Sequence, residues 1–251
     1  SREMLDIREA EYGGEMLYIN KSAHHPMWAM EYSRDEGLRK YWDEYSYPYH
    51  KEGAGPLYRG KDASDYNHNQ DMLAVENIRR WFDYWQERPG TGTRISSGGV
   101  KIIFSDTNTH FRGEENYRRS GVTDAMRIPK DAFYAHQVMW DGWVDIEQPR
   151  IHIIGHWNYK EDVIKPVYVV SGADKVELFL NGKSLGEGER EYHFLYTFKD
   201  VQFETGKLEA IGYDETSKEC CRTELQTAGK PEEIRLTFVQ SPDGWKADGA
   251  D

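Results

Sequence analysis

A glutamate at the end of a short apolar run is the first residue whose surroundings are suited to catalysis. Residues 27–30 read Met-Trp-Ala-Met, which has the length and composition of a buried strand, and Glu31 follows directly. Tyr32 and Arg34 come next and can keep the carboxylate ionised. At the mouth of a parallel barrel such a carboxylate can be the nucleophile of a retaining glycosidase, or simply a solvated side chain beside Arg34.

A second polar stretch follows another predicted strand. Residues 100–104 read Val-Lys-Ile-Ile-Phe and predict a strand, and Asp106, Asn108 and His110 come after it. Short polar side chains at a strand end can orient sugar hydroxyls, and they can equally form a polar turn. Because one long helical connection joins the two strands, we expect them to be parallel neighbours that bring Glu31 within about 15 Å of Asn108.

Residues with metal or sulfur chemistry give weaker signals. His24 and His25 are adjacent and have no partner at a ligand spacing, so we expect no metal site and no cofactor. Cys220 and Cys221 are the only cysteines. A disulfide between neighbouring residues is strained, so both are predicted to be free thiols in a strand.

Composition narrows the classes of partner. The formal net charge of −12 argues against a nucleic-acid partner, which requires a basic surface. No apolar run approaches the roughly 20 residues that span a bilayer. Aromatic residues make up 14% of the chain and supply flat apolar faces that stack on sugar rings, which favours carbohydrate. The charged residues at 112–115 and 118–119 are predicted to form a solvated face.

The first part of the chain alternates between strand and helix patterns. One helix is predicted from a cap at Asn69 to a stop at Pro89. Its apolar face is predicted to comprise Met72, Val75, Ile78, Phe82 and Trp85. A second helix is predicted over residues 130–140, helical spacing also marks residues 35–49, and residues 91–99 are predicted to be a loop. This alternation indicates parallel strands with helices outside them.

From about residue 150 the apolar residues recur at every second position. Residues 176, 178 and 180 share one face, and Asn181-Gly182 is a strong signal for a tight hairpin. The alternation resumes over residues 192–198. Strands about 8 to 12 residues apart with turn signals between them predict an immunoglobulin-like sandwich. Residues 230–251 are predicted to begin a further β-domain.

Three stretches and their order along the chain resemble glycoside hydrolase family 2, the family of β-galactosidases and β-glucuronidases. Residues 24–34 look like the seventh strand of the family's catalytic barrel. Residues 121–134, Gly-Val-Thr-Asp-Ala-Met-Arg-Ile-Pro-Lys-Asp-Ala-Phe-Tyr, resemble the return into its last barrel helix. Residues 176–186, Val-Glu-Leu-Phe-Leu-Asn-Gly-Lys-Ser-Leu-Gly, are similar to the β-sandwich that follows the barrel in many bacterial members.

The resemblance implies a domain order. Residues 1–148 would be the carboxyl-terminal part of a (β/α)8 TIM barrel, residues 149–229 an immunoglobulin-like β-sandwich, and residues 230–251 the incomplete start of a further β-domain. We therefore expect both chain ends to be cuts in a longer protein, whose remaining domains would be partners of this segment. The family also suggests a periplasmic or secreted bacterial protein.

The resemblance also implies a site. Glu31 would be the nucleophile, and the substrate would contact Tyr32, Arg34, Asp106, Asn108 and His110. The acid/base residue is expected on the fourth barrel strand, upstream of residue 1, so the chain alone should be inactive. Family members usually carry an aromatic residue near Asp106, where this chain has Phe104 and then polar residues, and this departure leaves the sugar open.

The implied activity is retaining hydrolysis of β-linked galactosides in oligo- or polysaccharides. Two alternatives stay open from the sequence alone. The first is a related β-glucuronidase or β-mannosidase. The second is a non-catalytic carbohydrate-binding or scaffolding segment of a larger protein.

Overall fold

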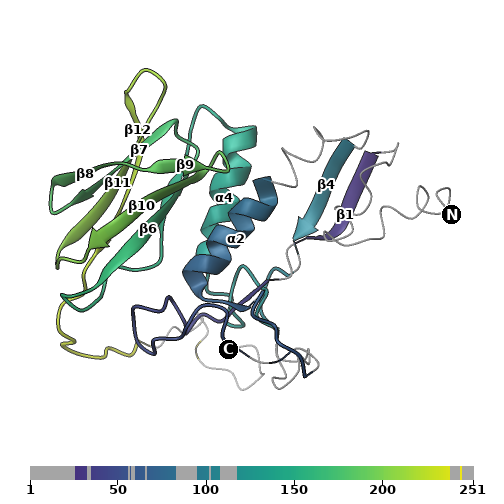
Figure 1. The fold of residues 1–251 in the computed structure, drawn as a ribbon, viewed down its shortest axis with the longest axis horizontal. Helices are drawn as coiled ribbons and strands as arrows, with labels where there is room; N and C mark the ends of the chain where they lie inside the picture. Colours follow the sequence, from purple (N-terminus) through teal and green to yellow (C-terminus); the bar gives the residue numbers. More distant parts are fainter. Residues whose placement is uncertain are drawn as a thin grey trace.

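The structure is a computed structural model in which strands outnumber helices (Figure 1). It describes residues 26–32, 35–55, 57, 60–65, 67–82, 95–101, 103–107, 118–237 and 244. Within these ranges the chain forms strands β1 to β12 and helices α2 and α4.

The two strands expected to flank the candidate site are adjacent and parallel, as predicted. β1 (Pro26–Tyr32) contains the apolar run and Glu31, and β4 (Ile95–Lys101) lies beside it. The predicted bounds of the second strand were wrong, because β4 begins inside the expected loop over residues 91–99. Pairing with β1 holds the Gly98-Gly99 backbone extended, although glycine has a low intrinsic preference for strands.

Two antiparallel four-stranded sheets follow and face each other (Figure 1). One has the order β5 (Ile151–Ile154), β6 (Ile164–Ser171), β10 (Leu195–Gln202), β9 (Glu189–Glu191). The other has the order β12 (Glu219–Gln226), β11 (Lys207–Tyr213), β7 (Lys175–Leu180), β8 (Lys183–Glu187). Their inner faces share an apolar core that includes Val167, Val169, Val176, Leu178, Leu180, Tyr196, Phe198, Leu208 and Ala210. The predicted β-sandwich is confirmed.

The hairpin between β7 and β8 is the turn that the sequence predicts. Asn181 and Gly182 have φ angles of 52° and 81°, and Leu180 pairs with Lys183 across the turn. Two left-handed residues are the signature of a type I′ turn, which asparagine and glycine tolerate best. Asn181 Oδ1 also accepts a hydrogen bond from the Lys207 backbone N–H at 2.9 Å, which fixes the turn to β11.

One other prediction for the β-region was wrong in part. Tyr192 and His193 have φ angles of 46° and 65°, so the predicted alternation over residues 192–198 starts only with β10. Phe194 consequently joins the core around the helices and not the core of the sandwich. Residues 227–237 contain no strand, and Ile234 and Leu236 are 92% and 84% exposed there. Residues 238–243 and 245–251 lie outside the described residues, so the further β-domain over residues 230–251 stays a prediction.

Helices α2 (Gln70–Phe82) and α4 (Asp131–Val144) pack against each other, and α4 also contacts β5 and β6. Their shared core includes Leu73, Ala74, Ile78, Trp81, Ala135, Val138 and Met139. The second predicted helix is confirmed. The predicted apolar face of α2 was wrong in part, because Ile78 is buried but Met72, Val75 and Phe82 are only half-buried. Packing against α4 buries a neighbouring face that carries Leu73, Ala74 and Trp81. Trp85 and Pro89 lie outside the described residues.

The segment between β1 and α2 is irregular, although the spacing over residues 35–49 predicted a helix. Its only strands among the described residues are β2 (Glu36–Gly37) and β3 (Asn67–His68), which pair in parallel. Asp43 Oδ1 accepts hydrogen bonds from the backbone N–H groups of Tyr45 at 3.0 Å and Ser46 at 2.9 Å. A side chain that takes these donors offers the backbone an alternative to the helical ladder.

Candidate active site

The candidate site lies where β1 and β4 end, because parallel strands bring their carboxyl ends to one edge (Figure 1). Glu31 precedes the last residue of β1, and the register places Tyr32 opposite Lys101. Outside the described residues lie the candidates Arg34, Asn108 and His110, together with His24 and His25. The catalytic role of Glu31 and its proximity to Asn108 therefore stay predictions.

Asp106 is the predicted substrate contact whose side chain is described, and it is buried. Its Oδ1 accepts hydrogen bonds from the Gly121 N–H at 2.9 Å and from Lys130 Nζ at 2.9 Å. A Cβ on Gly121 would lie 2.4 Å from the Asp106 nitrogen, so this approach requires glycine. Burial raises the pKa of the Asp106 carboxyl, and the Lys130 ammonium opposes the rise. Its contact with substrate stays a prediction.

Lys130 joins three segments at one point. Besides Asp106, its ammonium donates to the carbonyl oxygens of Gly37 at 2.7 Å and Arg119 at 3.1 Å. Burial lowers the pKa of Lys130, and Asp106 opposes that shift. Three acceptors match the three donors of an ammonium, so the charged form is fully hydrogen-bonded. Lys130 thus fixes β2 and the segment after β4 to the start of α4.

A second buried pair of charged residues, Glu36 and Arg119, lies beside Lys130. The Glu36 carboxylate accepts hydrogen bonds from the Arg119 backbone N–H at 2.8 Å and from Ser120 Oγ at 3.1 Å. The Arg119 guanidinium donates to Asn67 Oδ1 at 3.1 Å, which connects β3 to the same cluster. Arg118 and Arg119 are both buried, so the prediction of a solvated face at residues 118–119 was wrong. Arg118 Nε donates to Ser120 Oγ at 2.9 Å, and Arg119 Nε lies 3.6 Å from Glu36 Oε2, so the Arg119 charge is paired inside the protein.

The Asp35 carboxylate, just after β1, binds two cations from other elements. Arg80 Nε lies 3.0 Å from Asp35 Oδ2, and His68 Nε2 lies 3.3 Å from Asp35 Oδ1. The other ring nitrogen of His68 is 2.5 Å from Glu52 Oε1. Burial lowers the pKa of His68, but the hydrogen bonds to Asp35 and Glu52 outweigh it and raise the pKa to about 9. His68 is therefore a cation between two carboxylates at neutral pH.

A third cluster joins the irregular segment to the sandwich. Asp43 is buried, accepts a hydrogen bond from the Tyr159 hydroxyl, and lies 3.4 Å from Lys165 Nζ. Burial alone would raise the pKa of Asp43, but Lys165 and the hydrogen bonds lower it. His156 Nε2 is 3.1 Å from Ser46 Oγ in the same contact. The chain that leaves the Glu31 strand is thus held directly by the sandwich.

These buried clusters were missed by the sequence analysis. Glu36, Asp43 and Lys130 are separated from their partners by tens of residues, and no local periodicity marks such pairs. The described residues contain no group of three or more histidine, cysteine, aspartate or glutamate side chains that could hold a metal ion. No helix in the described ranges has the length and apolarity to cross a membrane.

Comparison with known proteins shows which sequences and structures this chain resembles. A domain of unknown function (DUF4982) matches residues 162–221, inside the sandwich. A β-glucuronidase of Formosa agariphila is 35% identical over 234 residues, which are 90% of this chain and 22% of the relative. The β-galactosidase BoGH2A of Bacteroides ovatus is 36% identical over 119 residues, which are 47% of this chain and 13% of that protein. A solved β-glucuronidase from glycoside hydrolase family 2 matches with a TM-score of 0.69 and 30% identity, over 90% of this chain and 22% of its own.

A sequence relative and a solved structure, both named β-glucuronidases, thus match most of the chain. The chain is a homologue of the glycoside hydrolase family 2 enzymes. It spans about a fifth of the length of the first of these relatives, at 22%.

Proposed function

We propose that the protein containing this chain is a retaining β-glycosidase and that Glu31 is its nucleophile. The observation that carries the proposal is the position of Glu31 near the carboxyl end of β1, beside the parallel strand β4, in a homologue of family 2 glycosidases. We propose further that β1 and β4 are the last two strands of a (β/α)8 barrel. Catalytic side chains of such barrels lie at the carboxyl ends of their strands.

In this mechanism the Glu31 carboxylate attacks the anomeric carbon and forms a glycosyl ester as the leaving group departs. Water then hydrolyses the ester from the same face, so two inversions retain the configuration. A second carboxyl group about 5–5.5 Å away protonates the leaving group and later activates the water. The family resemblance assigns that group to a strand upstream of residue 1. Asp35 follows Glu31 closely, but its carboxylate is held by Arg80 and His68 and is poorly suited to that role.

The names of the relatives suggest which sugar the enzyme removes. The relative from Formosa agariphila is named a β-glucuronidase, and it matches over nearly the whole chain. The relative from Bacteroides ovatus is named a β-galactosidase and matches about half of it. We therefore propose β-glucuronides as the first substrates to test and β-galactosides, which the sequence analysis favoured, as the second.

The test is turnover of nitrophenyl β-glucuronide and β-galactoside by the full-length protein and its Glu31→Gln variant. Glutamine keeps the size and one oxygen but cannot form the glycosyl ester, so we expect turnover to be lost while the sugar still binds. An activated leaving group should not restore activity, because it replaces the acid and not the nucleophile. Near-normal turnover by the variant would refute the assignment. Hydrolysis by the isolated 251-residue chain would show that the acid/base residue lies within it, and sugar binding with no turnover by the full-length protein would favour the non-catalytic alternative.

A further inference from the structure

Two neighbouring cysteines lie at an irregular point of the sandwich. In β12, Cys221 pairs with Gly212 of β11, but the next pair joins Tyr213 to Glu219, which leaves Cys220 as an extra residue in a β-bulge. In a regular strand, consecutive side chains point to opposite faces of the sheet. A bulge places two residues opposite one and relaxes that alternation. Accordingly the two Sγ atoms lie only 3.9 Å apart, and both cysteines are free thiols, as predicted.

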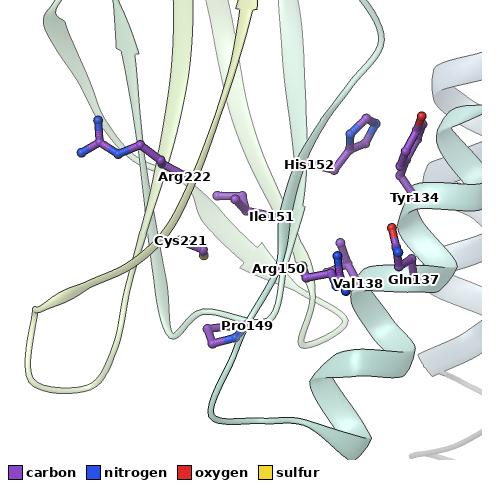
Figure 2. Close-up of a pocket in the computed structure, with 9 residues that line it drawn as sticks. All are labelled: Tyr134, Gln137, Val138, Pro149, Arg150, Ile151, His152, Cys221 and Arg222. Atoms are coloured by element: carbon purple, nitrogen blue, oxygen red, sulfur yellow. The ribbon is translucent and has the colours of Figure 1, made fainter.

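The surroundings make room for the inner sulfur and leave the outer one accessible. A Cβ on Gly212 would lie 2.5 Å from Cys221 Sγ, so glycine at that position is what admits the sulfur. Cys221 Sγ also lies 3.8 Å from Ser171 Oγ. Cys221 lines a cavity of about 330 Å³ between α4, β5 and β12. Figure 2 shows Tyr134 and Val138 on the opposite side, on α4. Cys220 is exposed to solvent.

The separation of the sulfurs fits a bridging atom better than a disulfide. A disulfide needs sulfurs about 2.05 Å apart, so the pair would have to close by almost half its distance within one dipeptide. An ion that bonds each thiolate at about 2.3 Å, the zinc–sulfur distance, with a tetrahedral angle holds the sulfurs about 3.8 Å apart. No third histidine, cysteine or acidic side chain among the described residues completes a metal-binding group. The geometry therefore favours a soft ion that two protein sulfurs satisfy, rather than four-coordinate zinc.

We propose that Cys220 and Cys221 form a chelating site for soft, thiophilic ions of low coordination number, with trivalent arsenicals as the chemical class. With phenylarsine oxide, two As–S bonds replace the bonds between arsenic and its oxygen. The two thiol protons leave with that oxygen as water, and arsenic stays trivalent throughout. The reaction needs no oxidant or reductant, and it does not depend on the proposed glycosidase activity.

The experiment treats the full-length protein with phenylarsine oxide and then challenges it with millimolar glutathione, a monothiol competitor. Cleavage at Lys218 and Arg222 by trypsin isolates residues 219–222, which contain both cysteines. We expect that peptide to carry one phenylarsenic group and to lack two hydrogens. Chelation by two linked thiols should make retention against glutathione on the order of 100-fold greater than in Cys220→Ser or Cys221→Ser.

The Gly212→Ala variant is the geometric control, because it keeps both thiols but places a methyl group against Cys221 Sγ. We expect it to retain less arsenical than the wild type while thiol titration still counts both cysteines. If this variant fails to fold, the two single-serine variants still decide the matter. Equal retention by either of them, or modification only outside residues 219–222, would overturn the proposal. So would recovery of the peptide from untreated protein as a disulfide.

Discussion

The sandwich and the connecting segment, by which we mean the described residues between β1 and the start of α4, are stabilised by different interactions. The sandwich core is an apolar cluster from two sheets, in which residues such as Val169, Val176 and Leu208 are fully buried. The connecting segment instead buries charges, among them Glu36 and Lys130. Apolar burial is non-directional and tolerates small rearrangements, whereas a buried charge depends on specific partners. Substitutions of buried charges in the connecting segment should therefore lower the free energy of unfolding more than comparable substitutions in the sandwich.

The sharpest way to break this contrast is to remove the ammonium of Lys130. Lys130→Met keeps much of the side-chain length but leaves the Asp106 carboxylate buried without its cation and removes one donor from each of two carbonyl groups. We expect the free energy of unfolding to fall by about 3–5 kcal/mol, as is usual when one partner of a buried pair is lost. Chemical denaturation of the two proteins measures the difference.

Lys199→Met is the matched control on the sandwich. Its ammonium lies 2.5 Å from Glu189, but both side chains are largely exposed. Water and salt screen an exposed pair, so this variant should change the free energy of unfolding little. Equal losses in the two variants would contradict the distinction drawn between the regions.

A pH titration sharpens the comparison, because it reports on His68 in the connecting segment. The folded-state pKa of about 9 lies above the unfolded value of 6.5, so His68 contributes its full stability below pH 6.5 and loses it as the pH rises through 9. The difference in unfolding free energy between the wild type and His68→Gln should shrink by on the order of 3 kcal/mol across that window. A difference that stays constant from pH 6 to about 9.5 would show that His68 is not a paired cation.

A backbone substitution gives the smaller effect expected in the sandwich. Gly182 has φ of 81°, which valine adopts only under strain, so Gly182→Val should destabilise the protein by about 1–3 kcal/mol. Gly229→Val serves as the control, because that glycine has ordinary φ and open space around its Cβ position. Thermal melts compare the two, and turnover of the full-length protein should be unchanged in both. Unaltered stability of Gly182→Val would argue against the tight turn.

The sequence predicted the sandwich well because its signals are local. Alternation at residues 176, 178 and 180 and the Asn181-Gly182 turn depend on neighbours a few positions away, and β7 and β8 form there. The failures also have local causes. Tyr192 and His193 adopt left-handed conformations that interrupt an otherwise convincing alternation. Backbone hydrogen bonds accepted by the Asp43 carboxylate replace the helix that the spacing predicted.

The environment of the candidate site could not be predicted in the same way. Lys130 and Asp106 are 24 positions apart, and Arg119 and Glu36 are 83 apart, so only the folded chain brings them together. A run of charges such as the one around Arg118 is usually solvated, and nothing in its composition distinguishes the buried case. Glu31 itself was chosen as the candidate nucleophile because a strand pattern and a family resemblance coincide at that residue.

The most direct test of the account is to identify the residue that becomes covalently glycosylated. The full-length protein is incubated with a fluorinated β-glucuronide or β-galactoside, whose slowed second step allows the glycosyl ester to accumulate, and is then digested with trypsin. The account predicts a label within residues 22–34, on Glu31, and no label in the Glu31→Gln variant. A label on any other residue would contradict the assignment of Glu31 as the nucleophile.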